Sequence, residues 1–141
     1  MTVALASDHA GFELKAILKA ELEAMGYAVL DLGTDGPASV DYPDYGSAAG
    51  KAVAEGRAGR GLIVCGTGIG ISIAANRHAG ARAALCQDAT TARLAREHND
   101  ANILALGSRI IGSEVAKECL RVFLATEFAG GRHKPRVEKL G

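Results

Sequence analysis

The chain has 141 residues and a formal net charge of zero, with 16 basic and 16 acidic residues. This balance does not favour nucleic acid or an acidic surface as a partner. No apolar run approaches the ~20 residues that span a bilayer, and the N-terminus has no signal-peptide pattern. Three scattered cysteines cannot all pair, so we expect a reduced, cytoplasmic protein with one domain over residues 1–141 and no membrane partner.

Short apolar runs alternate with segments of helical periodicity along the chain. Strands are expected at residues 3–6, 28–32, 62–64, 81–86 and 103–106. Helices are expected at residues 12–25, 45–55, 69–78, 88–98 and 113–128, with Asp88 and Ser113 as caps of the last two. Alternation of this kind predicts an α/β fold in which helices cover both faces of a parallel sheet.

A basic segment at residues 130–141 follows the last expected helix. It holds five cationic or histidine side chains around Pro135. This C-terminal arm is either a loose terminus or a segment that docks on an anionic ligand or a neighbouring subunit.

A glycine-rich loop follows the third expected strand. Cys65 ends the strand, and Gly66, Gly68 and Gly70 alternate after it. Glycines allow backbone N–H groups to approach a ligand closely, and such a loop at a helix N-terminus forms an anion-binding concavity. The loop therefore brings a thiol, the Thr67 hydroxyl and several amide donors to the carboxyl end of a strand, where open parallel sheets bind ligands.

The three cysteines have different surroundings. A lone cysteine is most often a small buried apolar residue, which is the reading we prefer for Cys86 and Cys119. Cys65 differs because a helix N-terminus and converging amides favour a thiolate. We therefore expect Cys65 to be reactive.

Several known phosphate loops fit the glycine pattern incompletely. A Walker A loop needs a lysine that is absent here. A thiol phosphatase loop would place its arginine where Ile71 stands. A dinucleotide fingerprint would need glycine at that position, although Asp88 lies where a ribose-binding carboxylate would be expected, which keeps a cofactor interpretation open.

Other polar side chains are expected near the same sheet edge. Asp8 and His9 close the first strand and are either a helix cap and a surface residue or members of a shared site. His98 either stabilises a helix C-terminus or exchanges protons near neutral pH. Arg109 is either a solvated loop charge or a ligand contact. No spacing typical of metal ligands occurs, so no metal site is expected.

Motifs along nearly the whole chain resemble type B ribose-5-phosphate isomerase, whose family also includes allose-6-phosphate and galactose-6-phosphate isomerases. The motifs are Ser-Asp-His-Ala-Gly-Phe at 7–12, Asp-Tyr-Pro at 41–43, Cys-Gly-Thr-Gly-Ile-Gly-Ile-Ser-Ile-Ala-Ala-Asn at 65–76, His-Asn-Asp-Ala-Asn at 98–102, Leu-Gly-Ser-Arg at 106–109 and Gly-Gly-Arg-His-x-x-Arg at 130–136.

The resemblance implies a three-layer Rossmann-like sandwich with a five-stranded parallel sheet in the order 2-1-3-5-4. It implies a homodimer, sometimes doubled to a tetramer, whose active sites each combine two subunits. It also implies an enzyme of the pentose phosphate pathway that isomerises a phosphorylated sugar from aldose to ketose through a cis-enediolate, without metal or organic cofactor.

The resemblance also assigns catalytic roles. Cys65 is the matched carbon base, and Thr67 relays a proton between O1 and O2. His98 is the matched acid and base for ring opening. The enediolate is stabilised by the backbone amides of the loop that contains Gly66, Gly68, Ile69 and Gly70. Some relatives lack the cysteine and use a glutamate a few residues later, whereas here Cys65 is present and Ile71 is apolar.

Substrate-binding roles follow in the same way. Asp8 and Asn99 are expected to hold sugar hydroxyls, and Tyr42 is expected to line the cavity. A second group is expected to bind the phosphate, for which the planar guanidinium fork is suited: His9, Arg109, Arg132 and Arg136. By resemblance, His98, Asn99 and Arg109 face the Cys65 loop of the neighbouring subunit.

Three alternatives remain beside ribose 5-phosphate isomerisation. In the first alternative the substrate has one more carbon, and the protein is a hexose 6-phosphate isomerase, such as one acting on allose 6-phosphate. The same fold also serves non-catalytic sugar-phosphate or nucleotide binding modules, although a binder needs no carbon base. A mixed assembly with a paralogous subunit is the third.

Overall fold

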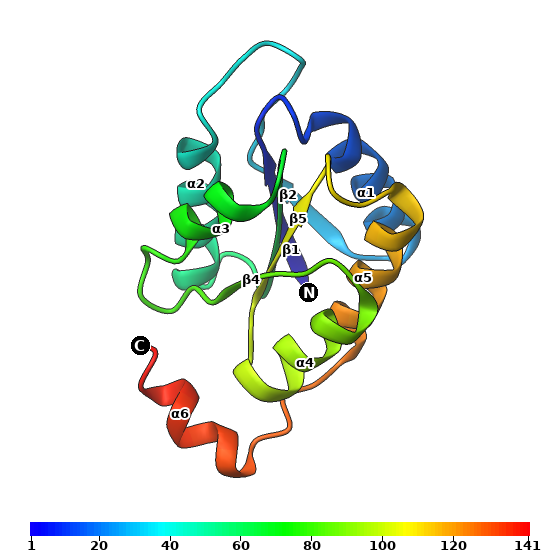
Figure 1. Cartoon of the computed structure of the whole chain (residues 1–141). Coiled ribbons are helices and arrows are strands. Elements are labelled where there is room, and N and C mark those ends of the chain that lie inside the picture. Colours follow the sequence, from blue (N-terminus) through cyan, green and yellow to red (C-terminus); the bar gives the residue numbers. More distant parts are fainter.

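Five parallel strands form one sheet in the computed structural model, which describes residues 1–141 (Figure 1). Their order is β2-β1-β3-β5-β4, which confirms the predicted topology. The strands are β1 (Thr2–Ser7), β2 (Ala28–Asp31), β3 (Arg60–Cys65), β4 (Ala83–Leu85) and β5 (Ile103–Gly107). The edge strand β4 is shorter than predicted: the backbone N–H of Arg82 donates to the Asn102 side chain and not to a neighbouring strand.

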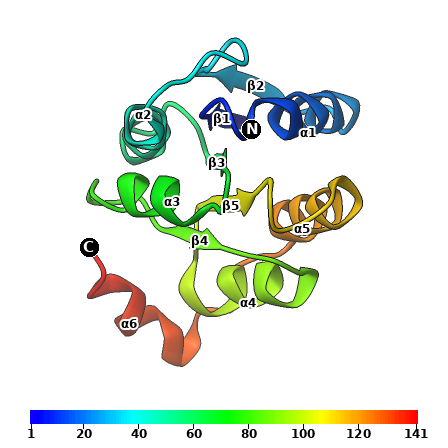
Figure 2. The same cartoon turned by 45° about the horizontal axis from the view of Figure 1, so that its top comes forward.

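Helices cover both faces of this sheet, as predicted (Figure 2). The helical segments are α1 (Phe12–Ala24), α2 (Tyr42–Ala54), α3 (Ile69–Ala75), α4 (Ala89–Asn99), α5 (Ser113–Ala125), the 3₁₀ turn η1 (Gly131–His133) and α6 (Lys134–Glu138). Leucines of α1, alanines of α4, and Leu120 and Phe123 of α5 line one core, and alanine-rich faces of α2 and α3 line the other.

The α2–α3 layer is thin because glycine lies where the two helices touch. A Cβ atom on Gly46 would lie 2.6 Å from the carbonyl oxygen of Ile71, and one on Gly50 would lie 2.7 Å from that of Ala75. Side chains at these two positions would force α3 away from α2. The small residues therefore determine where α3 lies, and with it the loop that precedes it.

Several helix ends differ from the prediction by a few residues. Helix α2 begins at Tyr42 and not at Tyr45, because Asp41 is extended and Pro43 fits the first turn of a helix. The cap of α5 is Gly112 and not Ser113, and the helix ends at Ala125, before Phe128. The predicted cap of α4 is confirmed, since Asp88 Oδ1 accepts the backbone N–H of Thr91 at 2.7 Å.

The basic C-terminal arm continues beyond α5 as η1 and α6, at the bottom of Figure 1. No helix of the structure combines the length and apolar character needed to cross a bilayer. The loops that follow β1, β3 and β5 lie at the opposite, upper end of the same view.

Candidate active site

An open cavity of about 430 Å³ lies where the loops after β1, β3 and β5 meet. Most of its lining comes from residues singled out in the sequence, joined by Ile73: Asp8, Tyr42, Cys65, Gly66, Thr67, Ile69, Gly70, Ile73 and Arg109. The carboxyl ends of neighbouring parallel strands share one edge of a sheet, so residues far apart in the chain converge there.

Cys65 is the last residue of β3, and only 5% of its surface is exposed. Its Sγ accepts the backbone N–H of Gly68 at 3.1 Å. Gly68 has a φ of +78°, and a Cβ atom there would lie 2.8 Å from the carbonyl carbon of Leu106. The turn that directs this N–H toward sulfur therefore requires glycine. A donated N–H beside the start of a helix stabilises negative charge on the sulfur.

Thr67 lies exposed in the same loop. Its Oγ1 accepts the backbone N–H of Ile69 at 3.2 Å. A hydroxyl has one proton and two lone pairs, so the Thr67 proton remains available to a ligand. The side chain can therefore both donate and accept at the mouth of the cavity.

The loop after β5 is tied directly to the loop after β3. The N–H groups of Ser108 and Arg109 donate to the carbonyl oxygens of Cys65 and Gly66, each at 2.9 Å. Gly107 permits this approach, because a Cβ atom there would lie 2.5 Å from the carbonyl oxygen of Thr67.

Arg109 is the cationic wall of the cavity. A Cβ atom on Gly66 would lie 3.3 Å from its Nη1. Arg109 thus lies beside the Cys65 loop of its own chain, and its expected placement against a neighbour's loop was wrong. The reason is the backbone pairing of the two loops, which joins Arg109 to Gly66 within one chain.

Asp8, His9 and Tyr42 complete this end of the sheet. Asp8 is buried, and its Oδ1 accepts the N–H of Gly11, which is the actual cap of α1. His9 Nδ1 accepts the N–H of Val40 at 3.1 Å, which leaves Nε2 as the donor of the neutral ring. The Tyr42 ring lies over Gly70, at a position that a side chain on Gly70 would overlap.

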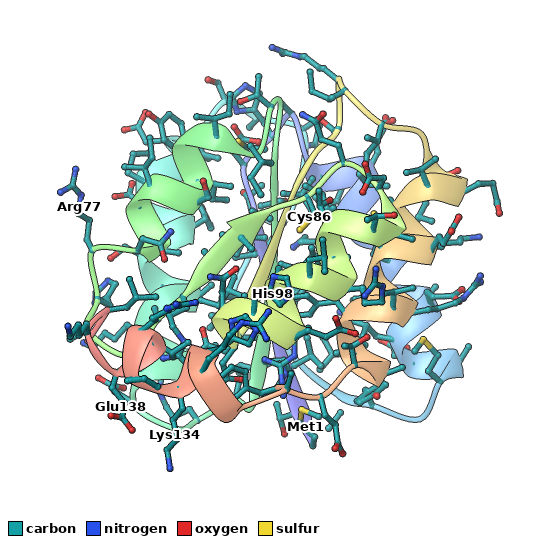
Figure 3. The ribbon with its side chains drawn as sticks, turned by 60° about the horizontal axis from the view of Figure 1, so that its bottom comes forward. Met1, Arg77, Cys86, His98, Lys134 and Glu138 are labelled. Carbon is teal, nitrogen blue, oxygen red and sulfur yellow. The ribbon has the colours of Figure 1, made fainter.

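The remaining predicted residues lie at the other end of the molecule. His98 and Asn99 end α4, which runs back from the carboxyl edge of the sheet to its amino edge. Arg132 and Arg136 lie on η1 and α6 beside them, and Figure 3 shows His98 facing α6. The predicted site residues therefore form two groups that one chain does not bring together.

The His98 group has features that sequence reasoning missed. The rings of His98 and His133 stack with centroids 4.5 Å apart and planes 17° from parallel. Partial burial, followed by the positive charges of Arg132, His98 and Arg136, lowers the pKa of His133 below its ordinary value. His133 is part of the Gly-Gly-Arg-His motif that was noted in the sequence. Its stack on His98 was missed because helix periodicity gives no signal for contacts between residues far apart in the chain.

The structure holds no group of three or more His, Cys, Asp or Glu side chains arranged to bind a metal ion. The chemistry assembled around Cys65 is a thiol, a hydroxyl, backbone amides, a carboxylate and a guanidinium. Such a set can bind an anionic, hydroxylated molecule and move a proton at a carbon next to a developing oxyanion.

A family model described as Ribose/Galactose Isomerase matches residues 3–140. The chain belongs to the ribose/galactose isomerase family. It is 46% identical to ribose-5-phosphate isomerase B of Escherichia coli over 138 residues, which are 98% of this chain and 93% of that protein. It is 41% identical to a D-erythrulose-4-phosphate isomerase of Pectobacterium atrosepticum over 143 residues, covering 100% of this chain and 93% of that protein.

Solved structures of this isomerase family have the same fold. Ribose-5-phosphate isomerase B of Clostridium thermocellum superposes with a TM-score of 0.99 at 50% identity, over 100% of this chain and 95% of that one. The Thermotoga maritima enzyme gives 0.96 at 50% identity, over 99% and 96%. This ribose/galactose isomerase is thus a sugar-phosphate isomerase, an intramolecular oxidoreductase.

Replacing Gly68 with alanine should disable the Cys65 loop of the isomerase. The positive φ and the contact with Leu106 both oppose a side chain, with strain of about 1–3 kcal/mol. Because the Gly68 N–H would leave Sγ, we expect kcat/KM to fall at least about tenfold. Steady-state assays measure this loss, and Gly36→Ala is the control because nothing lies within 4 Å of its Cβ position. Equal activity of the two variants would contradict the role of Gly68.

Acidification should loosen the docked arm of the isomerase. The pKa of His133 is lowered in the folded protein. Its contribution to the stability of the folded arm is therefore fully present above the unfolded pKa of about 6.5 and is lost as the pH falls through the folded pKa. We expect faster limited proteolysis within residues 130–141 at pH 5 than at pH 7.5. His133→Gln should remove this pH dependence. His78→Gln is the control and should keep it, because His78 forms a hydrogen bond with Ser47. Equal cleavage of the native chain at both pH values would refute the expectation.

Proposed function

We propose that this protein interconverts ribose 5-phosphate and ribulose 5-phosphate through a cis-enediolate. The observation that carries the proposal is the hydrogen bond from the Gly68 N–H to Cys65 Sγ at the floor of the cavity. It supports the proposal because an N–H donor aimed at sulfur, beside further backbone amides, suits proton abstraction next to a carbonyl.

The reaction needs no external oxidant, because one carbon is reduced as its neighbour is oxidised. The Cys65 thiolate removes the proton from C2 of the open-chain aldose, and the electrons of that C–H bond form the C1–C2 double bond. Negative charge develops on O1, where the other N–H groups of the 66–70 loop stabilise it, since those of Gly68 and Ile69 already donate to Cys65 Sγ and Thr67 Oγ1. The Sγ–H then returns the proton to C1, while Thr67 transfers a proton between O2 and O1.

Ring opening and part of the phosphate grip are proposed to come from a second copy of the chain. The predicted residues for these tasks, His98, Asn99, Arg132 and Arg136, all lie at the end of the molecule opposite the cavity. In a twofold dimer the far end of one copy can reach the cavity of the other, twice by symmetry.

Exposed apolar side chains support such a dimer. Ile69 and Ile73 on α3 each have 51% of their surface exposed, and Leu140 has 63%. Ile69 and Ile73 both border the cavity. Exposed apolar side chains beside a cavity are typical of an interface between protein subunits.

Arg109 and His9 are proposed to complete the phosphate site from the same copy as Cys65. The Arg109 guanidinium borders the cavity and offers paired donors to a phosphate. His9 has its Nε2 proton free, because Nδ1 already accepts from Val40. Asp8 and Tyr42, which also line the cavity, are proposed to supply the sugar contacts.

The test of function is conversion of ribose 5-phosphate by the purified chain in the presence of a chelator. Allose 6-phosphate and D-erythrulose 4-phosphate run in parallel, the latter because a relative in this family acts on it. Preference for ribose 5-phosphate would support the proposal. Preference for another sugar phosphate would keep the mechanism and change the substrate. No turnover of any of them would favour a non-catalytic binding module.

Replacing Cys65 with alanine should lower kcat by about 10²–10⁴-fold, because the carbon base is lost. Ribose 5-phosphate binding, measured by calorimetry, should remain, since the amides and Arg109 are unchanged. Cys86→Ala is the matched control, because that thiol packs in the opposite core and burial raises its pKa. A Cys65→Ala enzyme with near-normal kcat would refute the thiolate mechanism.

Mixing two inactive variants tests the shared site. Cys65→Ala and His98→Ala subunits should each be nearly inactive alone. After random reassociation, half of the dimers are mixed and each of these has one intact site, so about a quarter of the native activity should return. Mixing Cys65→Ala with Cys65→Ala, Thr67→Ala as a double variant is the control and should restore nothing. If the first mixture forms dimers but recovers no activity, His98 does not belong to a shared site.

A further inference from the structure

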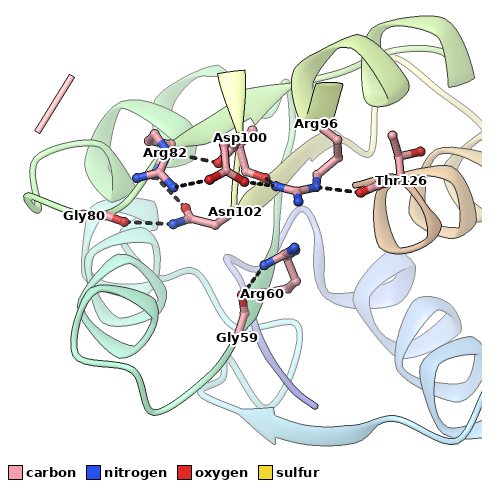
Figure 4. Close-up of polar contacts among 9 residues, drawn as sticks. Gly59, Arg60, Gly80, Arg82, Arg96, Asp100, Asn102 and Thr126 are labelled. Atoms are coloured by element: carbon pink, nitrogen blue, oxygen red, sulfur yellow. Dashed lines mark hydrogen bonds and ion pairs between the residues drawn. The ribbon is translucent and has the colours of Figure 1, made fainter. Parts of the chain in front are cut away.

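Arg96 is the most deeply buried arginine of the chain, with 2% of its surface exposed. It lies on the last turns of α4, two residues before His98. Its guanidinium makes three short hydrogen bonds, drawn in Figure 4: Nη1 to Asp100 Oδ1 at 2.7 Å, Nη1 to the Ala101 carbonyl at 2.7 Å and Nε to the Thr126 carbonyl at 3.0 Å.

Burial of this charge has no evident benefit for stability alone. Removing the guanidinium from water is costly, and an apolar residue of similar size is often at least as stabilising in such a place. Leu104 and Phe123 already supply apolar surface in the same core, and the Arg96 guanidinium lies 5.8 Å from the Phe123 ring centroid. What the guanidinium adds is a defined geometry, since its donors are held in one plane.

The first segment that Arg96 holds is the end of α4. Asp100 caps this helix in a left-handed conformation, with a φ of 45°, which few residues other than glycine adopt. Its carboxylate is held between Arg96 and Arg82, whose Nη2 lies 3.4 Å from Oδ2. This clamp sets the direction in which the chain leaves α4, directly after His98 and Asn99.

The second segment is the start of the C-terminal arm. Thr126 is where α5 ends and the chain becomes extended, and Arg96 Nε holds its carbonyl. Three residues later the Ala129 N–H donates to the Glu97 carbonyl at 3.1 Å. The stack of His133 on His98 is a third link between the same two segments.

We propose that Arg96 is a positioning residue that aligns the α4 end, carrying His98 and Asn99, with the arm, carrying Arg132 and Arg136. The inference rests on the proposed function, in which these two segments together enter the cavity of a second copy. Arg96 itself does not touch the substrate. It keeps the ring-opening histidine and the two phosphate-binding arginines at one mutual distance.

Arg96→Lys is the test variant, because it keeps the charge and one contact to Asp100 but cannot reach three acceptors. We expect KM for ribose 5-phosphate to rise about tenfold, since displacement of positioned groups by about 1 Å has effects up to 10²-fold. Arg93→Lys is the matched control on the same helix, because Arg93 is exposed and pairs only with Glu97 at 2.9 Å. Unchanged kinetics in Arg96→Lys would overturn the proposal.

Mixed dimers separate positioning from general damage. Arg96→Lys mixed with Cys65→Ala should show a kinetic component with the native KM beside the raised-KM component of the Arg96→Lys homodimers, because each mixed dimer joins an intact Cys65 loop to an intact His98 group. Arg96→Lys mixed with His98→Ala should stay at the raised KM. In each mixed dimer one site receives the His98→Ala group and the other receives the His98 group displaced by Arg96→Lys. Equal recovery in the two mixtures would overturn the proposal.

A readout independent of turnover is the imidazole NMR spectrum, since the chain has four histidines. Arg96→Lys should shift the ring signals of His98 and His133 and leave those of His9 and His78 in place. Movement of all four signals, or of none, would contradict the inference. This spectrum tests Arg96 even if the native chain turns over none of the sugar phosphates, an outcome that would refute the proposed function alone.

Discussion

The site depends on the contact between two loop backbones beyond the end of the sheet. The carbonyl oxygens of Cys65 and Gly66 accept the N–H groups of Ser108 and Arg109, so the pairing of β3 with β5 continues past both strands. This contact needs glycine at position 107, where a Cβ atom would meet the Thr67 carbonyl. It puts the thiol, the amide donors and the guanidinium on one rigid element, as positioned catalytic groups require.

The strand and helix order followed from the sequence because each physical signal was local. Alternating apolar runs marked the strands, and the glycine-rich segment after Cys65 marked the loop at a strand end. Asp88 was recognised as a cap because an aspartate before a helical run can accept a free N–H. The strand order came from the family resemblance, since periodicity does not specify which strands are neighbours.

The composition of the cavity was predicted more completely than its geometry. Asp8, Tyr42, Cys65, Thr67 and Arg109 do line one cavity. The placement of Arg109 was wrong because a short sequence motif does not encode which chain faces it. Ile73 and the His133 ring were missed because their roles come from packing between segments. Helix starts were displaced where proline or an extended residue altered the first turn, as at Tyr42.

The distance between the two groups of site residues has a consequence for how the activity responds to concentration. If His98 opens the sugar ring as proposed, the cavity at one end of a chain is complete only when a second copy brings its His98 to it. Under the proposed shared site, specific activity is therefore governed by mass action between copies. Dilution toward the dissociation constant of the pair would lower turnover per chain, while a ligand that bridges both copies would favour the assembled form. Substrate would then act as a linker of subunits as well as a reactant.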